Sequence, residues 1–195
     1  MKTTKFLLGA VLCFSLFLTS CSDDDDGGTP EQPNEEEVIT DVTLTLTNIT
    51  DTNDVVELKS VDPDGEDGPT APTITITGNF TAGATYTGVM DLFNSIEMED
   101  ITEEVTVTEP DEHFFTYAIS GLDISFSRSA NDIVRMDGNK LGFETTWVVA
   151  NNPGTGNITV QLWHESETVD DSNELGTQTG GEPDVDLTFT GVTIQ

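Results

Sequence analysis

Positive charge is scarce in this chain. Its 195 residues include 6 Lys and Arg against 37 Asp and Glu, which gives a formal net charge of −31 at pH 7. Binding to nucleic acid depends on clustered Lys and Arg that neutralise phosphates, so this class of partner is excluded. The same shortage argues against direct adsorption of the folded part to anionic lipid.

Cysteine is also rare, with Cys13 and Cys21 as the two examples. Cys13 lies inside an N-terminal apolar run, and Cys21 follows the end of that run. If the run is removed and Cys21 is acylated, no free thiol remains to form a disulfide. The sequence therefore excludes a small fold held together by disulfides.

Long apolar runs are limited to Phe6–Leu18, whose 13 residues are too few for a membrane-spanning helix of ~20 residues. Lys2 and Lys5 precede this run, as in a signal peptide. Residues 18–21, Leu-Thr-Ser-Cys, resemble a bacterial lipobox. We expect residues 1–20 to be a lipoprotein signal peptide and Cys21 to be the lipidation site. The alternative is an ordinary secretory signal followed by a Cys by chance.

The stretch after Cys21 is acidic and has nothing to bury. Residues 22–37 contain four Asp, four Glu and two Pro, with no aliphatic or aromatic side chain. Such a segment cannot offset the entropy cost of ordering, so residues 21–37 are expected to form a disordered tether. Residues 22–28 resemble the acidic export signal of surface-exposed Bacteroidetes lipoproteins. The expected location is the outer membrane, lipid-anchored and facing outward. The alternative is a spacer on an inward-facing lipoprotein.

From Val38 onward, apolar and polar residues alternate with a period of two, which indicates half-buried strands. Gly- and Pro-rich turns separate the alternating segments, and no long helical pattern is present. We therefore predict that residues 38–195 form one all-β domain, a single antiparallel β-sandwich of immunoglobulin-like type. About nine strands are expected, at residues 40–49, 54–61, 73–80, 84–93, 112–120, 122–128, 141–150, 156–165 and 184–194.

Two local features interrupt this pattern. The apolar parity of the last strand slips between Phe189 and Val192, which predicts a bulge at Gly191. Residues 97–104 are the one short stretch that favours a helix. The expected core combines the aliphatic residues of the strands with a further set of large side chains: Phe80, Tyr86, Met90, Leu92, Phe115, Tyr117, Phe126, Phe143, Trp147 and Val149.

Three segments resemble short surface lipoproteins of flavobacterial type, a Bacteroidetes group of uncharacterised function. They are the acidic run 103–115 with its Asp-Glu-His-Phe-Phe ending, the strand 158–165, and the C-terminal segment 180–195. The resemblance covers most of residues 40–195 and implies a surface lipoprotein, but it carries over no functional residue. Proteins of this kind are sometimes labelled as periplasmic-binding folds, which need alternating strands and helices that are missing here.

One acidic loop has the composition of a cation site. Calcium takes 6–8 oxygen ligands, and the turn at residues 62–68 offers Asp62, Asp64, Glu66 and Asp67 around Gly65. The loop departs from the EF-hand pattern because Gly65 comes too early and no Glu stands at the twelfth position. The alternative is a solvated turn, since Asp, Pro and Gly are ordinary turn residues.

Both histidines, His113 and His164, fall on the inward parity of a strand and near its end. If those strand ends are adjacent, the pair together with Glu112 or Glu165 has the donor atoms for a transition metal. The alternative is two histidines at the rim of the sandwich with hydrogen-bonded rings.

Trp163 has the outward parity of its strand, because Ile158, Val160 and Leu162 take the inward positions. An exposed indole beside Gln161 suits stacking on a sugar ring or contact with a partner. The alternative is a Trp covered by a neighbouring loop.

Motifs for catalysis are missing: the sequence contains no nucleophile elbow, no HExxH and no phosphate-binding loop. We therefore expect a non-catalytic lipoprotein that acts as a binding or structural accessory module on the outer membrane, with calcium as the candidate ion. Its contact with the membrane would be through the lipid anchor only, and its partner a glycan or protein at the cell surface. The alternatives are a glycan-binding accessory protein that uses Trp163, and a small carboxylate-based hydrolase.

Overall fold

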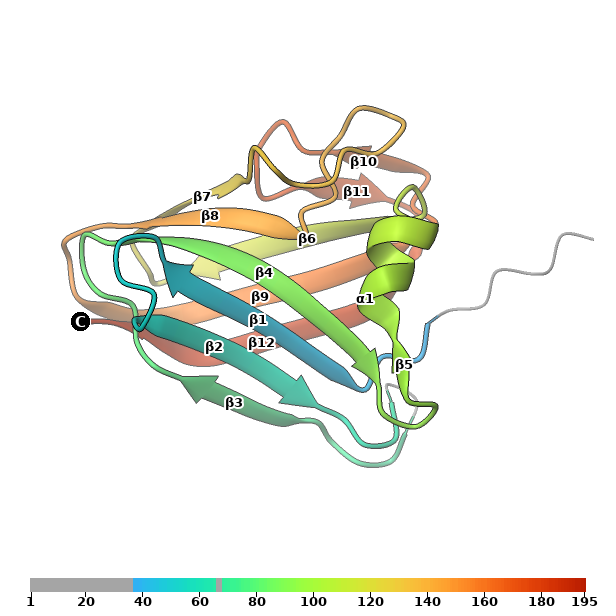
Figure 1. Ribbon diagram of the computed structural model, residues 1–195, viewed down its shortest axis with the longest axis horizontal. Helices are drawn as coiled ribbons and strands as arrows, with labels where there is room; N and C mark the ends of the chain where they lie inside the picture. The colour runs from blue at the N-terminus through green and yellow to red at the C-terminus, as the bar shows by residue number, and fades with distance from the viewer. Residues whose placement is uncertain (1–36, 66–67) are drawn as a thin grey trace, which may run out of the picture. The chain divides into compact units, whose positions relative to one another are not determined.

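Residues 37–65 and 68–195 are described by the computed structural model, in which twelve strands pair with their neighbours in antiparallel fashion (Figure 1). The predicted all-β sandwich is confirmed. The predicted signal peptide, the lipidation site Cys21 and the tether up to Glu36 lie outside the described residues. Among those that are described, no helix has the length and apolar character needed to cross a membrane.

The strands form two facing sheets and one short ribbon. The larger sheet has seven strands, in the order β3 (Thr73–Thr77), β2 (Val55–Val61), β1 (Asp41–Asn48), β4 (Thr85–Asn94), β8 (Glu144–Val149) and β7 (Ile124–Arg128), with β5 (Glu99–Asp100) beside β4. The smaller sheet has the order β12 (Glu182–Ile194), β9 (Gly154–His164) and β6 (His113–Ser120). The ribbon consists of β10 (Thr168–Asp170) and β11 (Thr177–Thr179).

Each of the nine predicted strands is present, and β5, β10 and β11 are additional. These three have two or three residues each, which is too short for a period of two to stand out in a sequence. The predicted helix at 97–104 lies further along the chain, as α1 (Ile101–Glu103) and the π-helical turn η1 (Glu104–Thr108). It begins at Ile101 because Asp100 caps it, accepting a 3.0 Å hydrogen bond from the backbone N–H of Thr102.

The core between the sheets is centred on Trp147, which is fully buried. The rings of Phe126 and Phe80 lie 4.9 Å and 6.5 Å from its ring, centroid to centroid. Its indole N–H donates a 2.8 Å hydrogen bond to Thr145 Oγ1, which meets the need of a buried polar group. Of the ten large side chains predicted for the core, Phe126 and Phe143 are only partly buried and the other eight are buried.

The predicted bulge at Gly191 is confirmed by a shift in the β12–β9 register between Thr190 and Val192. Gly191 has a φ of 91°, a left-handed conformation that glycine adopts without steric cost. Ile74 has the inward parity of β3, opposite buried Ser60 on β2, but its side chain is 40% exposed. The reason is that β3 is the edge strand of the larger sheet, and the three-stranded sheet opposite is too narrow to cover it.

Candidate metal centre

Two histidines meet on neighbouring strands of the smaller sheet. The antiparallel register of β6 and β9 places His113 directly opposite His164. Their rings stack with 4.8 Å between centroids and 13° between planes. Both side chains are buried, with exposed fractions of 0% and 4%. The two strand ends are therefore adjacent, which was the condition that the sequence set for a metal site.

Asp184 joins the pair because β12 has a second irregularity. The β12–β9 register shifts between Pro183 and Val185, so Asp184 is the extra residue of a bulge. A bulge re-aims side chains, and here Asp184 and Val185 are buried one after the other. Under the strict alternation of β12, Asp184 would lie on the outward face with Asp186, but its side chain is buried. The bulge turns the carboxylate toward His113 and His164.

Glu37 comes from the segment just before β1. The sequence assigned this residue to the tether, yet its side chain is only 5% exposed and lies against both histidines. Residues 37–40 lead into β1 at the end of the sandwich that carries α1 (Figure 1). Four side chains from four separate segments therefore converge: Glu37, His113, His164 and Asp184.

The spacing of their donor atoms suits a small tetrahedral ion. Glu37 Oε2 lies 3.1 Å from His113 Nε2 and 3.4 Å from His164 Nδ1. The two carboxylate oxygens of Asp184 lie 3.7 Å from the same two nitrogens. One donor atom from each residue lies within 4.8 Å of all the others. In a tetrahedral zinc site with bonds of about 2.1 Å, neighbouring donor atoms are about 3.4 Å apart.

Each imidazole also has a contact at its second ring nitrogen, the one that faces away from Glu37 and Asp184. His113 Nδ1 lies 3.0 Å from the carbonyl oxygen of Glu109. Because a carbonyl only accepts, Nδ1 donates this hydrogen bond, and Nε2 is the nitrogen that faces Glu37 and Asp184. His164 Nε2 lies 3.7 Å from Glu112 Oε2, which leaves Nδ1 facing Glu37 and Asp184. Such outer contacts are typical of histidines that bind metals.

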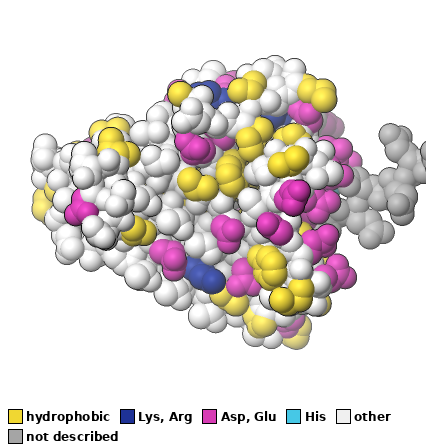
Figure 2. Space-filling model, viewed as in Figure 1, with side chains coloured by type: hydrophobic (Ala, Val, Ile, Leu, Met, Phe, Trp, Pro, Cys, Tyr) yellow, Lys and Arg dark blue, Asp and Glu magenta, His cyan; other side chains and the backbone are white. Residues whose placement is uncertain are grey.

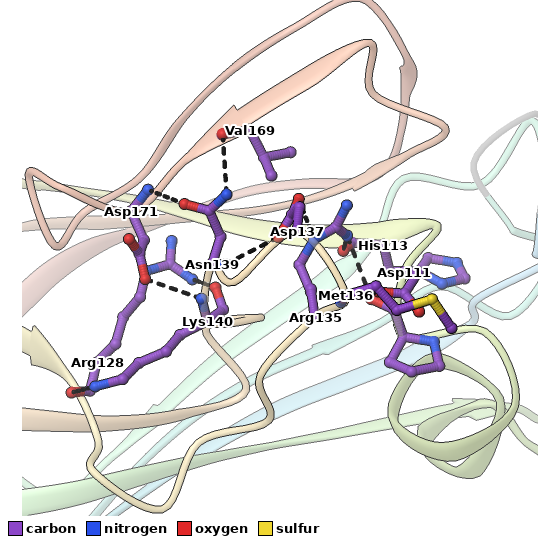
Figure 3. A network of polar contacts seen from close by, with 11 residues as sticks. Asp111, His113, Arg128, Arg135, Met136, Asp137, Asn139, Lys140, Val169 and Asp171 are labelled. Atoms are coloured by element: carbon purple, nitrogen blue, oxygen red, sulfur yellow. Dashed lines mark hydrogen bonds and ion pairs between the residues drawn. The ribbon is translucent and has the colours of Figure 1, made fainter.

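The backbone at His113 is held by Arg135 (Figure 3). The Arg135 guanidinium donates to the carbonyls of His113 and Pro110, and its Nε lies 3.2 Å from Asp137 Oδ2. The guanidinium thus binds the backbone that leads into β6. This contact fixes the start of β6 without placing a positive charge among the four converging side chains.

Charge around the site is strongly negative. Burial by itself would raise the pKa of Glu37, but the hydrogen bond and charge of His113, with the charge of His164, lower it. Burial would lower the pKa of His113, but Glu37 and Asp184 and the Glu109 carbonyl raise it. Burial and the negative charges of Glu37, Glu109 and Glu99 raise the pKa of Glu104. Figure 2 shows Asp and Glu side chains gathered at the end of the domain that carries the helical turn.

The acidic partners expected from the sequence lie on the outer side of the histidine pair. Glu112 and Glu165 form a separate group with His164, in which Glu165 is exposed. The inner donors are Glu37 and Asp184, which sequence reasoning missed. Pro183, just before the bulge, was a usable signal for Asp184, because proline cannot donate to a strand ladder. Glu37 gave no signal, since it looked like the other tether acids.

In the acidic loop, Asp62 and Asp64 are described, whereas Glu66 and Asp67 lie outside the described residues. Asp64 Oδ2 accepts a 3.1 Å hydrogen bond from the N–H of Thr70, and Asp62 Oδ1 accepts one of 3.4 Å from the N–H of Asp64. Neither residue belongs to a group of metal donors found within the described ranges. The carboxylates of Asp62 and Asp64 therefore accept hydrogen bonds from backbone amides and stabilise the turn.

Trp163 lies on the outer face of the smaller sheet, as its parity predicted, and is half-buried. It is paired with Phe114 on β6 and Pro183 on β12. Its indole N–H donates a 3.0 Å hydrogen bond to Thr116 Oγ1. The polar edge of the ring is therefore already bound within the sheet.

Comparison of the chain with protein-family models, with curated proteins and with solved structures gives no match. Its function has to be inferred from the side chains described above.

Proposed function

We propose that this chain is a non-catalytic, surface-anchored lipoprotein whose β-sandwich binds a transition metal ion of the zinc class. The supporting observation is the convergence of Glu37, His113, His164 and Asp184, with each pair of donor atoms within 4.8 Å. Buried carboxylates and imidazoles are costly unless they are paired or bind a metal. A divalent ion at their centre would balance the negative charge of the two carboxylates.

The donor set favours zinc over calcium. Zinc binds imidazole nitrogen and carboxylate oxygen in a four-coordinate tetrahedron. Calcium needs 6–8 oxygen ligands and does not select imidazole. Two of the four donors are the nitrogens of His113 and His164, so an oxygen-seeking ion would use only half of the site. The calcium expected from the sequence is therefore replaced by zinc in this proposal.

Four protein donors also favour a structural ion over a catalytic one. Catalytic zinc sites keep one position open for water or substrate, whereas structural sites use four protein ligands. Here all four donors are buried side chains. This supports the expectation from the sequence that the protein is not an enzyme.

Anchoring belongs to the same proposal. Acylation at Cys21 would hold the chain on the outer membrane, and the acidic segment that follows would place the sandwich at the cell surface. Contact with the membrane would be through the lipid alone. Zinc would stabilise a domain that has no disulfide to do so.

The test is a zinc titration of the full chain, purified without a histidine tag because such a tag binds the same metals. Isothermal titration calorimetry in chelator-treated buffer is expected to show one zinc per chain. His113→Asn is expected to weaken binding at least ~100-fold, because changes outside the first ligands alone cost ~10–100-fold. Asp64→Asn, in the acidic loop, is the matched control and should bind as the wild type does. A folded wild-type chain that takes up no zinc would overturn the proposal.

A further inference from the structure

We propose that the metal acts as a clasp, defined as the ion together with its four ligands, that holds the N-terminal segment 37–40 against the smaller sheet. This inference rests on the proposed function, since it assumes that the ion binds. His113, His164 and Asp184 belong to β6, β9 and β12 of the smaller sheet, whereas Glu37 leads into β1 of the larger sheet. An ion bound to all four would link the two layers at one end of the sandwich.

The segment that carries Glu37 is hydrogen-bonded to the larger sheet at Thr40. The N–H of Thr40 donates a 3.1 Å hydrogen bond to the carbonyl of Phe93, and its hydroxyl lies 2.8 Å from that of Ser95. Ile39 is buried, but Val38 is 49% exposed. The chain is therefore fixed from Thr40 onward, and Glu37 is held by its contacts with the histidines.

One side of the segment borders a pocket that is partly open to solvent. Ile39 and Thr40 line it together with Asp184, Val185 and Leu187, and its volume is about 160 Å³. The protein therefore does not enclose the segment on this side.

Without an ion, Glu37 is drawn to the two histidines and repelled by the neighbouring carboxylates. Glu37 forms an acidic group with Glu104 and Glu109, with donor oxygens within 4.8 Å of one another. Asp184 adds a fourth carboxylate on the other side, and it shares the same two histidine nitrogens with Glu37. Like charges at this distance repel strongly at a buried site. A divalent ion bound to both carboxylates would offset their repulsion and add a bond to Glu37, so its removal should loosen Glu37 and Val38.

The consequence is that metal availability sets how much of the segment 37–40 is fixed on the domain. With the ion bound, the lead-in segment is fixed from Glu37. Without it, the fixed part begins near Thr40. A pull on the segment before Glu37 would act on the metal site in the first case and on the start of β1 in the second.

Hydrogen–deuterium exchange of the full chain, followed by mass spectrometry, tests the clasp. Exchange in peptides covering residues 38–41 is compared in zinc and in chelator, with β4 as an internal reference. At free zinc 100 times Kd, zinc can slow exchange through local opening by up to ~100-fold. We expect strong slowing in 38–40 and no change in β4. Glu37→Gln should lose that protection, whereas Glu97→Gln, an exposed acid in the turn after β4, should keep it.

The outcomes separate the two proposals. If zinc binds the wild type and exchange in 38–40 is the same with and without it, the clasp is wrong and the proposed metal site stands. If Glu37→Gln binds zinc as tightly as the wild type does, Glu37 is no ligand and the clasp is also wrong. If the wild type binds no zinc, the proposed function fails and the clasp fails with it.

Discussion

The imidazole of His113 stacks on the imidazole of His164 across the β6–β9 ladder, with both rings buried. Directly opposed residues of an antiparallel pair have side chains about 4.5–5.5 Å apart, and the 4.8 Å ring separation agrees with this. The strand register alone thus brings the histidines together. Glu37 and Asp184 then reach the pair from the N-terminal segment and from a bulge.

Zinc should raise the thermal stability of the full chain. A ligand bound only by the folded state at 100 times its Kd adds ~2.7 kcal/mol. For a domain of this size that corresponds to a rise in Tm of roughly 5–10 °C. Differential scanning calorimetry in zinc and in chelator measures the shift. His164→Asn should remove it, and an equal shift in that variant would show that zinc acts elsewhere.

Calcium should not stabilise the chain through the loop at 62–68. The carboxylate of Asp64 accepts a hydrogen bond from the N–H of Thr70 at the surface, so Asp64→Asn should lower Tm only slightly through the turn itself. The loss should be the same in calcium and in chelator. Melting curves at fixed ionic strength check this, with magnesium as the control ion. A calcium-specific rise in Tm that Asp64→Ala abolishes would instead establish the calcium site.

Arg128 should be among the most sensitive positions in the fold. Its buried guanidinium donates to the carbonyls of Glu174, Lys140 and Phe115, and lies 4.4 Å from the ring centroid of Phe114 (Figure 3 shows Arg128 and Lys140). A lysine has one ammonium group and cannot bind three separate carbonyls in this arrangement.

Arg128→Lys should therefore lower the free energy of unfolding by roughly 2–4 kcal/mol, because hydrogen bonds to charged groups contribute ~1.5–3 kcal/mol each. Urea denaturation measures the change. Lys59→Met is the control, since the ammonium of Lys59 is 3.7 Å from Asp41 at the surface and such pairs contribute about 0–1 kcal/mol. Similar losses in both variants would mean that burial of Arg128 has no special role.

Asp54 should make the free energy of unfolding depend on pH in the acidic range. Burial would raise its pKa, but hydrogen bonds from Asn48, Tyr86 and Thr81 outweigh this and lower it. A carboxyl with a lower pKa in the folded state stabilises the fold above its unfolded pKa of about 3.9. That contribution is lost as the pH falls through the folded pKa.

Asp54→Asn should therefore destabilise the chain most near neutral pH, and the difference from the wild type should shrink below about pH 4. Urea denaturation at a series of pH values measures it. Asp91→Asn, at an exposed position of β4, is the control and should show a small difference at every pH. A pH-independent loss in Asp54→Asn would show that the charge of Asp54 does not matter.

Much of the fold could be predicted from the sequence because alternation is a local property. Each of β1, β4 and β9 carries a polar and an apolar face in its own residues, and the bulge at Gly191 is visible as a slip in that pattern. Exposure of Ile74 could not be predicted, since it depends on the width of the opposite sheet.

The sequence by itself determined the donor chemistry and the strand ends on which His113 and His164 lie. Only the tertiary structure decided which acids join them. In a chain with 37 acidic residues, composition does not distinguish one carboxylate from another. Asp184 joins the histidines because of a register shift in β12, and Glu37 joins them because of the path of the chain into β1. Both features result from packing between segments far apart in the sequence.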